Sequence, residues 1–202
     1  MRVFVGSTSE MENNALAAIC FLERQTQGYD IQFDYWREWF ENSNVNGTYT
    51  WEVIERALSQ KGVECAIMFW SGDDSAKIRE RAYSITRDNV ILETGAFLAA
   101  KGRQNVFLLL DSDKDIRLAT DLLGLNVFQI DYQAPQMLNP NNKMILIKVS
   151  DELKSIERAI RVSSRSSDED YKKKVPSGDP SDLVDEGTAP EYKPRPRKMP
   201  TF

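Results

Sequence analysis

The run VECAIMFW at residues 63–70 is the clearest structural signal in this chain of 202 residues. It is almost continuously apolar, and NVFLLL at residues 105–110 repeats the pattern. Strands that are covered on both faces of a parallel sheet have this composition, whereas half-exposed strands alternate polar and apolar residues. The two runs therefore predict the centre of a parallel sheet with helices on both faces.

Strand-like runs and helical stretches alternate on either side of this centre. Further strands are predicted in RVFV at residues 2–5, DIQFDYW at 30–36 and NVFQID at 126–131. Helices are predicted at residues 11–25, 50–61, 89–102 and 143–160, and the charged stretch after residue 70 is expected to be irregular. Right-handed crossovers then give a doubly wound α/β fold with a five-stranded parallel sheet. In such sheets ligands bind beyond the carboxyl ends of the strands.

Composition excludes several classes of function. No apolar run approaches the roughly 20 residues of a membrane-spanning helix, and no signal peptide follows Met1, so we expect a cytoplasmic protein. The sequence has no histidine, and Cys20 and Cys65 lie far apart, so we expect neither a metal site nor a disulfide. Any catalysis must depend on carboxylates. A net charge of -5 argues against direct binding of nucleic acid.

The composition changes near Val162, which predicts a folded domain at residues 1–162 and a tail at residues 163–202. The tail is polar and Pro-rich, and its acidic residues are matched by basic ones. It has too few large apolar residues to form a core, so we expect it to be disordered or to order on a partner. The second alternative rests on EYKPRPRKMP at residues 191–200.

Polar residues follow three of the predicted strands. Ser7, Thr8 and Ser9 stand where a strand leads into a helix, which is a natural anion site. The alternative is a helix cap, with Ser9 and Glu12 forming a capping box. Both interpretations can hold at once.

The other two strand ends also leave alternatives open. Ser71, Asp73 and Asp74 follow the third strand and either contact a ligand or form a plain turn. Trp36, at the end of the second strand, either stacks on a nucleobase or nicotinamide ring or packs in the core.

The segment RDNVILETGAF at residues 87–97 places one acid, Glu93, among apolar side chains. We expect a helix capped by Asp88 or Asn89 and apolar around almost its whole circumference, so that Glu93 faces the interior or a cleft. Burial would raise the pKa of Glu93 and favour proton transfer or stabilisation of a positive charge. The competing explanation is a structural acid near a helix N-terminus, paired with Arg79, Arg81 or Arg87.

Four sequence blocks resemble bacterial TIR-like domains that act as effectors in cyclic-nucleotide antiphage systems of the CBASS, Pycsar and TIR-STING kinds. The resemblance runs from residue 2 to about residue 132 and implies a flavodoxin-like fold. The blocks are VFVGSTSE at 3–10, FWSGDD at 69–74, RDNVILETGAFLAAKGRQNVFLLL at 87–110 and ATDLLGLNVFQID at 119–131. Leu92, Thr94 and either Ala99 or Ala100 depart from the pattern usual in that family.

The resemblance implies an NAD+ glycohydrolase that releases nicotinamide and yields ADP-ribose or a cyclic product. Glu93 would be catalytic, NAD+ would be the substrate, and no cofactor would be required. The residues implied in substrate binding are Ser7, Thr8, Ser9, Trp36, Ser71, Asp74, Arg87 and Asn89.

The resemblance also implies regulated assembly. A homo-oligomer would form on activation, driven by a sensor protein or a cyclic-nucleotide-dependent partner, with residues 163–202 as one route of contact. Two alternatives remain open. One is an enzyme similar to nucleoside 2-deoxyribosyltransferases, and the other is a TIR module that binds nucleotides or assembles without catalysis.

Overall fold

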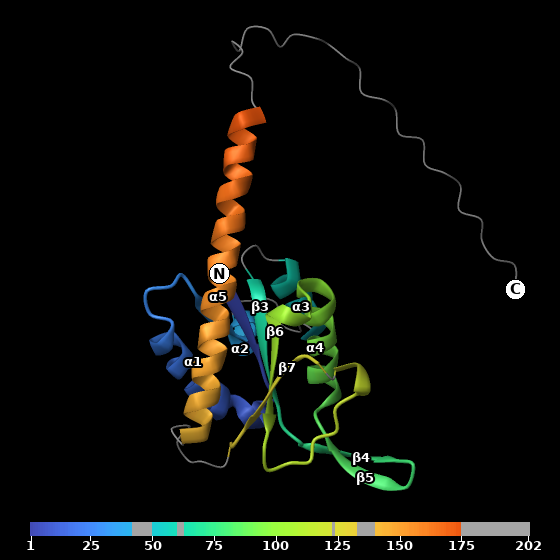
Figure 1. Ribbon diagram of the computed structural model, residues 1–202. Helices are drawn as coiled ribbons and strands as arrows, with labels where there is room; N and C mark the ends of the chain where they lie inside the picture. Colours follow the sequence, from blue (N-terminus) through green and yellow to red (C-terminus); the bar gives the residue numbers. More distant parts are fainter. Residues whose placement is uncertain (42–49, 60–62, 123, 133–139, 175–202) are drawn as a thin grey trace, which may run out of the picture. The chain divides into compact units, whose positions relative to one another are not determined.

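The computed structural model describes residues 1–41, 50–59, 63–122, 124–132 and 140–174. Its main sheet has five parallel strands in the order β2-β1-β3-β6-β7 (Figure 1). The strands are β1 (Arg2–Gly6), β2 (Gln32–Tyr35), β3 (Val63–Trp70), β6 (Val106–Asp111) and β7 (Asn126–Ile130). β3 and β6 are buried along nearly their whole length, as their apolar sequences predict. The predicted fold class is confirmed.

Helices cover both faces of this sheet. They are α1 (Glu12–Gln25), α2 (Trp36–Glu41), α3 (Thr50–Ser59), α4 (Asp88–Lys101) and α5 (Pro140–Lys174). One core layer joins α1 and α5 to one face, and a second joins α3 and α4 to the other. Because side chains alternate along a strand, neighbouring residues of β3 enter opposite layers. Cys65, Ile67 and Phe69 face the first layer, and Ala66, Met68 and Trp70 face the second.

The charged stretch after β3 is a β-hairpin, so the prediction of irregular structure was wrong. β4 (Asp74–Ile78) pairs antiparallel with β5 (Arg81–Ile85). The turn places Arg79 and Glu80 in the left-handed region, with φ of 48° and 67°. Two-residue hairpin turns with positive φ usually contain Gly or Asn, and neither marks this turn in the sequence.

Several predicted boundaries are corrected at strand and helix ends. β2 stops at Tyr35, and Trp36 already begins α2. The capping box is wrong, because Ser9 lies in the short 3-10 helix η1 (Ser9–Met11) and no side chain caps η1 or α1. The N-cap of α4 is Arg87 rather than Asp88 or Asn89.

The last helix is longer than predicted. It was expected to end near residue 160 but continues to Lys174. The residues after 160 are mostly polar, so no apolar period marked them as helical. Ion pairs one turn apart also stabilise a helix, and Glu157 and Arg161 form such a pair where this stretch begins.

The chain divides into units at residues 1–163 and 164–202. The segment EYKPRPRKMP lies outside the described residues. In the described part of the chain, no helix is long and apolar enough to cross a membrane.

Candidate functional site

Two buried hydroxyl residues meet at the carboxyl ends of the neighbouring strands β1 and β3. Thr8 follows β1 and Ser71 follows β3, and each side chain is about 3% exposed. Their hydroxyl oxygens lie 3.4 Å apart. Parallel pairing of β1 with β3 brings the two loops together, since both strands end at the same edge of the sheet. The structure therefore unites two of the residues selected from the sequence.

The carboxyl of Asp73 joins these hydroxyls. Thr8 Oγ1 donates to Asp73 Oδ2 over 3.0 Å, and Ser71 Oγ donates to the same oxygen. The Thr86 hydroxyl donates to the Ser71 carbonyl over 3.0 Å, which connects this cluster to the segment just before α4. The sequence drew attention to Asp73, but Asp74 was the acid selected for substrate binding. Asp74 lies instead at the start of the hairpin, where it is exposed and pairs with Ile85.

Ser7 has a different set of partners. Its hydroxyl donates to the Thr8 carbonyl over 3.0 Å, forms a 2.9 Å hydrogen bond with the Tyr35 hydroxyl, and accepts from Trp36 Nε1 at 3.3 Å. Trp36 is half-buried and packs against both core layers. The guanidinium of Arg37 lies 5.5 Å from the centre of the Trp36 ring. These contacts favour core packing for Trp36, and its role in stacking on a substrate stays a prediction.

Glu93 lies on the inner side of α4 and is only 7% exposed. Burial raises the pKa of the Glu93 carboxyl from its ordinary value of 4.5 to about 7. Next to it, Thr94 Oγ1 accepts from Trp70 Nε1 over 3.1 Å and donates to the Val90 carbonyl over 2.7 Å. This pair of bonds fixes α4 against β3 beside the acid.

The arginines proposed as partners of Glu93 lie elsewhere. Arg79 and Arg81 belong to the hairpin, and Arg87 pairs with Glu10 over 2.5 Å. Among the described side chains, none forms an ion pair with Glu93. Glu93 therefore has the character of a buried, unpaired acid, which is the first of the two alternatives drawn from the sequence.

The outer side of α4 is exposed, so the expectation that its almost wholly apolar circumference marks a buried helix was wrong. Ile91 is 40% exposed and Leu92 is 60% exposed. With Asp88 and Asn89 they line a hollow of about 560 Å³. Glu93 is not among the described residues that line it. Apolar residues of α4 thus lie on two sides of the helix, one packed in the core and one exposed to solvent.

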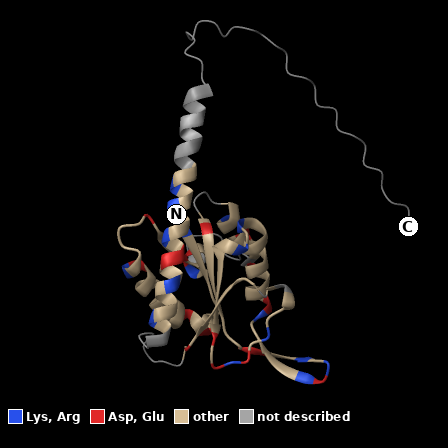
Figure 2. Cartoon of the chain, viewed as in Figure 1, with Lys and Arg blue, Asp and Glu red and all other residues tan. Residues whose placement is uncertain are grey.

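The carboxyl edge of the sheet is rich in acids. Figure 2 shows acidic residues along the edge where the strands end, and both basic and acidic residues on the hairpin. Asp111 ends β6 and is buried, which raises its pKa, although the backbone N–H of Asp113 donates to it and opposes the rise. No group of three or more potential metal ligands gathers among the residues whose placement is described.

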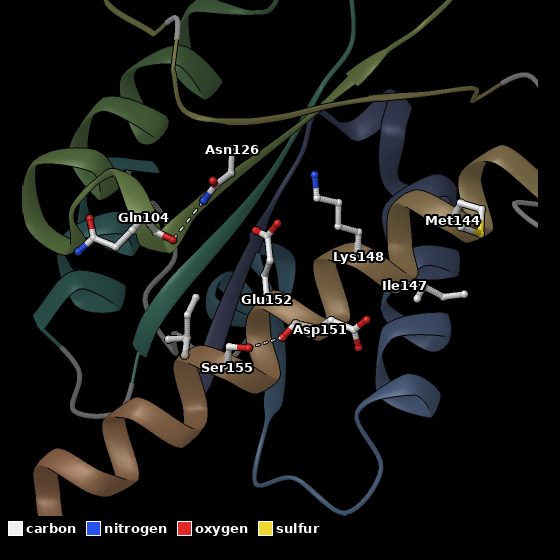
Figure 3. A pocket seen from close by; sticks show the side chains of 9 residues that line it. Gln104, Asn126, Met144, Ile147, Lys148, Asp151, Glu152 and Ser155 are labelled. Carbon is white, nitrogen blue, oxygen red and sulfur yellow. Dashed lines mark hydrogen bonds between the residues drawn. The ribbon is translucent and has the colours of Figure 1, made fainter.

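A larger hollow of about 650 Å³ lies along α5, beside the amino ends of β6 and β7 (Figure 3). Gln104 and Asn126 stand at the amino ends of β6 and β7, and Lys148 and Glu152 of α5 face them. The side-chain amide of Asn126 donates to the Gln104 carbonyl over 3.1 Å. Thr8 and Ser71 are not among the described residues that line this hollow. We place the candidate site at the carboxyl edge, because polar side chains selected from the sequence meet there.

A doubly wound parallel sheet in the order β2-β1-β3-β6-β7, with polar side chains at its carboxyl edge and a buried acid on α4, defines an α/β domain of the flavodoxin-like class. The family described as CAP12/Pycsar effector protein, TIR domain, matches residues 2–132. The chain belongs to this family.

Individual relatives agree with the family match. The Pycsar effector protein XpPycTIR of Xanthomonas perforans is 36% identical over 84 residues, which cover 42% of this chain and 27% of the relative. The CD-NTase-associated protein 12 of Flavobacterium daejeonense is 31% identical over 134 residues, covering 66% of this chain and 39% of the relative. The Pycsar effector protein PaPycTIR of Pseudomonas aeruginosa is 31% identical over 109 residues, covering 52% and 35% respectively. The matched regions thus span well under half the length of these relatives.

Proposed function

We propose that this chain is an NAD+ glycohydrolase that acts in antiphage defence by consuming NAD+ or by releasing a signalling product. The observation that carries the proposal is Glu93, a buried acid with no described ion pair and a pKa raised to about 7. Carboxyl groups with strongly shifted pKa values gather at functional sites. Membership of an effector TIR family supports the same reading.

The proposed reaction suits a single carboxylate. Nicotinamide in NAD+ is a cationic leaving group: when the ribose C1′–N bond breaks, the electron pair stays on nicotinamide, which departs neutral without a general acid. Glycosidases need one carboxyl to protonate the leaving group and a second to stabilise the oxocarbenium-like centre. Only the second role remains here, and Glu93 would fill it. Water then adds at C1′ and releases a proton, giving ADP-ribose. A cyclic product forms if a nucleophilic atom of the ADP-ribosyl group itself bonds to C1′ in place of water.

Residues near the start of α4 and at the carboxyl edge would position the substrate next to Glu93. Arg87 and Asn89 lie at the start of α4 and are proposed to orient the ribose, with Ser9 exposed on the adjoining turn. The Ser7 and Thr8 hydroxyls already donate within the protein, so their proposed role is to shape the carboxyl edge. Trp36 and Ser71 support that edge through Ser7 and Asp73.

Assembly of several copies is part of the proposal. Ile91 and Leu92 expose apolar surface on the same helix as Glu93, which suits contact with another copy. A sensor protein or a cyclic-nucleotide-dependent partner would trigger that contact, with residues 163–202 as one route. Activity is therefore to be measured with and without cyclic nucleotides, over a range of protein concentrations.

The test is NAD+ turnover by wild type and Glu93→Ala, with products identified by mass spectrometry. We expect nicotinamide and an ADP-ribose product from wild type and a loss of at least a hundredfold in the variant. Glu23→Ala is the matched control, because Glu23 is an exposed acid on α1. Equal rates for wild type and Glu93→Ala, with both proteins folded by circular dichroism, would end the proposal.

The pH profile gives an independent test. Glu93 must be ionised to stabilise a cation, so kcat/KM for NAD+ should rise as pH increases through about 7. A profile that is flat between pH 5.5 and 8.5, with chemistry rate-limiting, would contradict this role. Base exchange on deoxynucleosides without NAD+ cleavage would favour the transferase alternative, and assembly without either reaction would favour a non-catalytic module.

A further inference from the structure

Asp73 is an exposed carboxyl that is held by two buried hydroxyls. Thr8 Oγ1 donates to Asp73 Oδ2 over 3.0 Å, and Ser71 Oγ donates to the same oxygen. Both donors are about 3% exposed, so they are fixed by the surrounding protein. A surface aspartate is usually free to rotate, whereas this one is anchored through one oxygen.

The second carboxyl oxygen of Asp73 remains available. Within the described residues, Oδ1 accepts no hydrogen bond, and the residue is exposed to solvent. An ionised carboxylate can only accept hydrogen bonds, so the position suits a ligand that donates them. Because Oδ2 is already held, a ligand that binds Oδ1 meets an oriented acceptor and loses less conformational entropy on binding.

The location of Asp73 connects it to the proposed reaction site. Asp73 follows β3 at the carboxyl edge, and Thr8 follows the adjacent strand β1. The Thr86 hydroxyl donates to the Ser71 carbonyl over 3.0 Å, and α4, which carries Glu93, begins two residues after Thr86. The loop that carries Asp73 is therefore hydrogen-bonded to the segment that leads into α4, the helix that carries Glu93.

The negative charge of the Asp73 carboxylate determines which ligand groups it can bind. A phosphate carries negative charge and offers few donors, so the Asp73 carboxylate would repel it. A ribose hydroxyl is uncharged and can donate a hydrogen bond to Oδ1, the carboxylate oxygen that remains available. The hydroxyls of Thr8 and Ser71 direct their protons to Asp73, so this part of the edge presents acceptors rather than donors.

We propose that Asp73 Oδ1 accepts a hydrogen bond from the 2′-hydroxyl of the adenosine ribose of NAD+. This inference rests on the proposed function, in which Glu93 takes the nicotinamide-side ribose and leaves one ribose to be recognised. Asp73 thereby selects ribonucleotides over 2′-deoxyribonucleotides. Thr8 and Ser71 are positioning residues that act through Asp73.

The test is equilibrium binding of ADP-ribose to the full chain by calorimetry, compared with the analogue that contains 2′-deoxyadenosine. Wild type should bind ADP-ribose roughly tenfold more tightly than the deoxy analogue, as expected for loss of a hydrogen bond to a charged group. Asp73→Ala should bind the two compounds equally. Asp115→Ala is the matched control, because Asp115 is an exposed acid in the loop after β6, and it should keep the preference.

A separate measurement tests whether the Thr8 hydroxyl positions the Asp73 carboxylate. Thr8→Val should reduce the ratio between the two ligands while Thr8→Ser restores it, which a purely structural role would not do. An equal affinity of wild type for the two ligands, a preference that survives in Asp73→Ala, or no binding of ADP-ribose by wild type would each overturn the inference.

Failure of this inference can be separated from failure of the proposed function. A chain that shows the Asp73-dependent preference but does not cleave NAD+ contradicts only the hydrolase. A chain that cleaves NAD+ through Glu93 but keeps its preference in Asp73→Ala contradicts only the ribose contact.

Discussion

Replacing Glu93 by Gln should change how the stability of the fold depends on pH. The carboxyl is 7% exposed, and burial raises its pKa from 4.5 to about 7. The folded state therefore holds this proton more tightly than the unfolded state does. Stability from the protonated acid is fully present below pH 4.5 and is lost as pH rises through about 7.

The magnitude follows from the two pKa values. Their difference, at 1.36 kcal/mol per pH unit, corresponds to roughly 3 kcal/mol over the whole range. Gln has nearly the same shape but does not titrate. Between pH 5 and pH 8 the free energy of unfolding of wild type should therefore fall, relative to that of Glu93→Gln, by roughly 2–3 kcal/mol.

Urea denaturation of both proteins at several pH values measures this difference directly. Glu23→Gln, which changes an exposed acid on α1, is the control and should show no such trend. A constant difference between wild type and Glu93→Gln across this pH range would refute the reasoning, because it would mean that Glu93 keeps an ordinary pKa in the folded chain.

Three further predictions concern contacts around the candidate site. Thr94→Val should lower the free energy of unfolding by about 2 kcal/mol, because Trp70 Nε1 loses its buried acceptor; Thr94→Ser should recover most of it in the same urea titration, and equal losses would contradict this. Tyr132→Phe removes the 2.7 Å hydrogen bond to the carbonyl of a β6 residue and should cost about 1 kcal/mol, measured likewise; an unchanged midpoint would argue against that bond. Arg87→Gln removes an exposed ion pair and should leave stability unchanged within error, whereas a clear drop in melting temperature would show a structural role.

The hairpin after β3 and the exposed side of α4 were harder to predict than the sheet. The apolar runs of β3 and β6 predicted buried parallel strands because continuous hydrophobicity has few other uses in a chain of this polarity. The hairpin after β3 was missed because its turn contains Arg79 and Glu80 in place of the usual Gly or Asn. Hydropathy also could not tell which side of α4 is covered, since Ile91 and Leu92 are as apolar as the residues that face the core.

The amino-acid order alone was enough to specify the parallel α/β architecture and to single out Glu93 as the unusual acid, because these depend on local composition and spacing. The partners of each polar side chain depended on the packed fold. Thr8 and Asp73 are 65 positions apart and meet only because β1 and β3 are neighbours in the sheet. Likewise, the shift in the pKa of Glu93 arises from burial among side chains of several elements, which is a property of the assembled core.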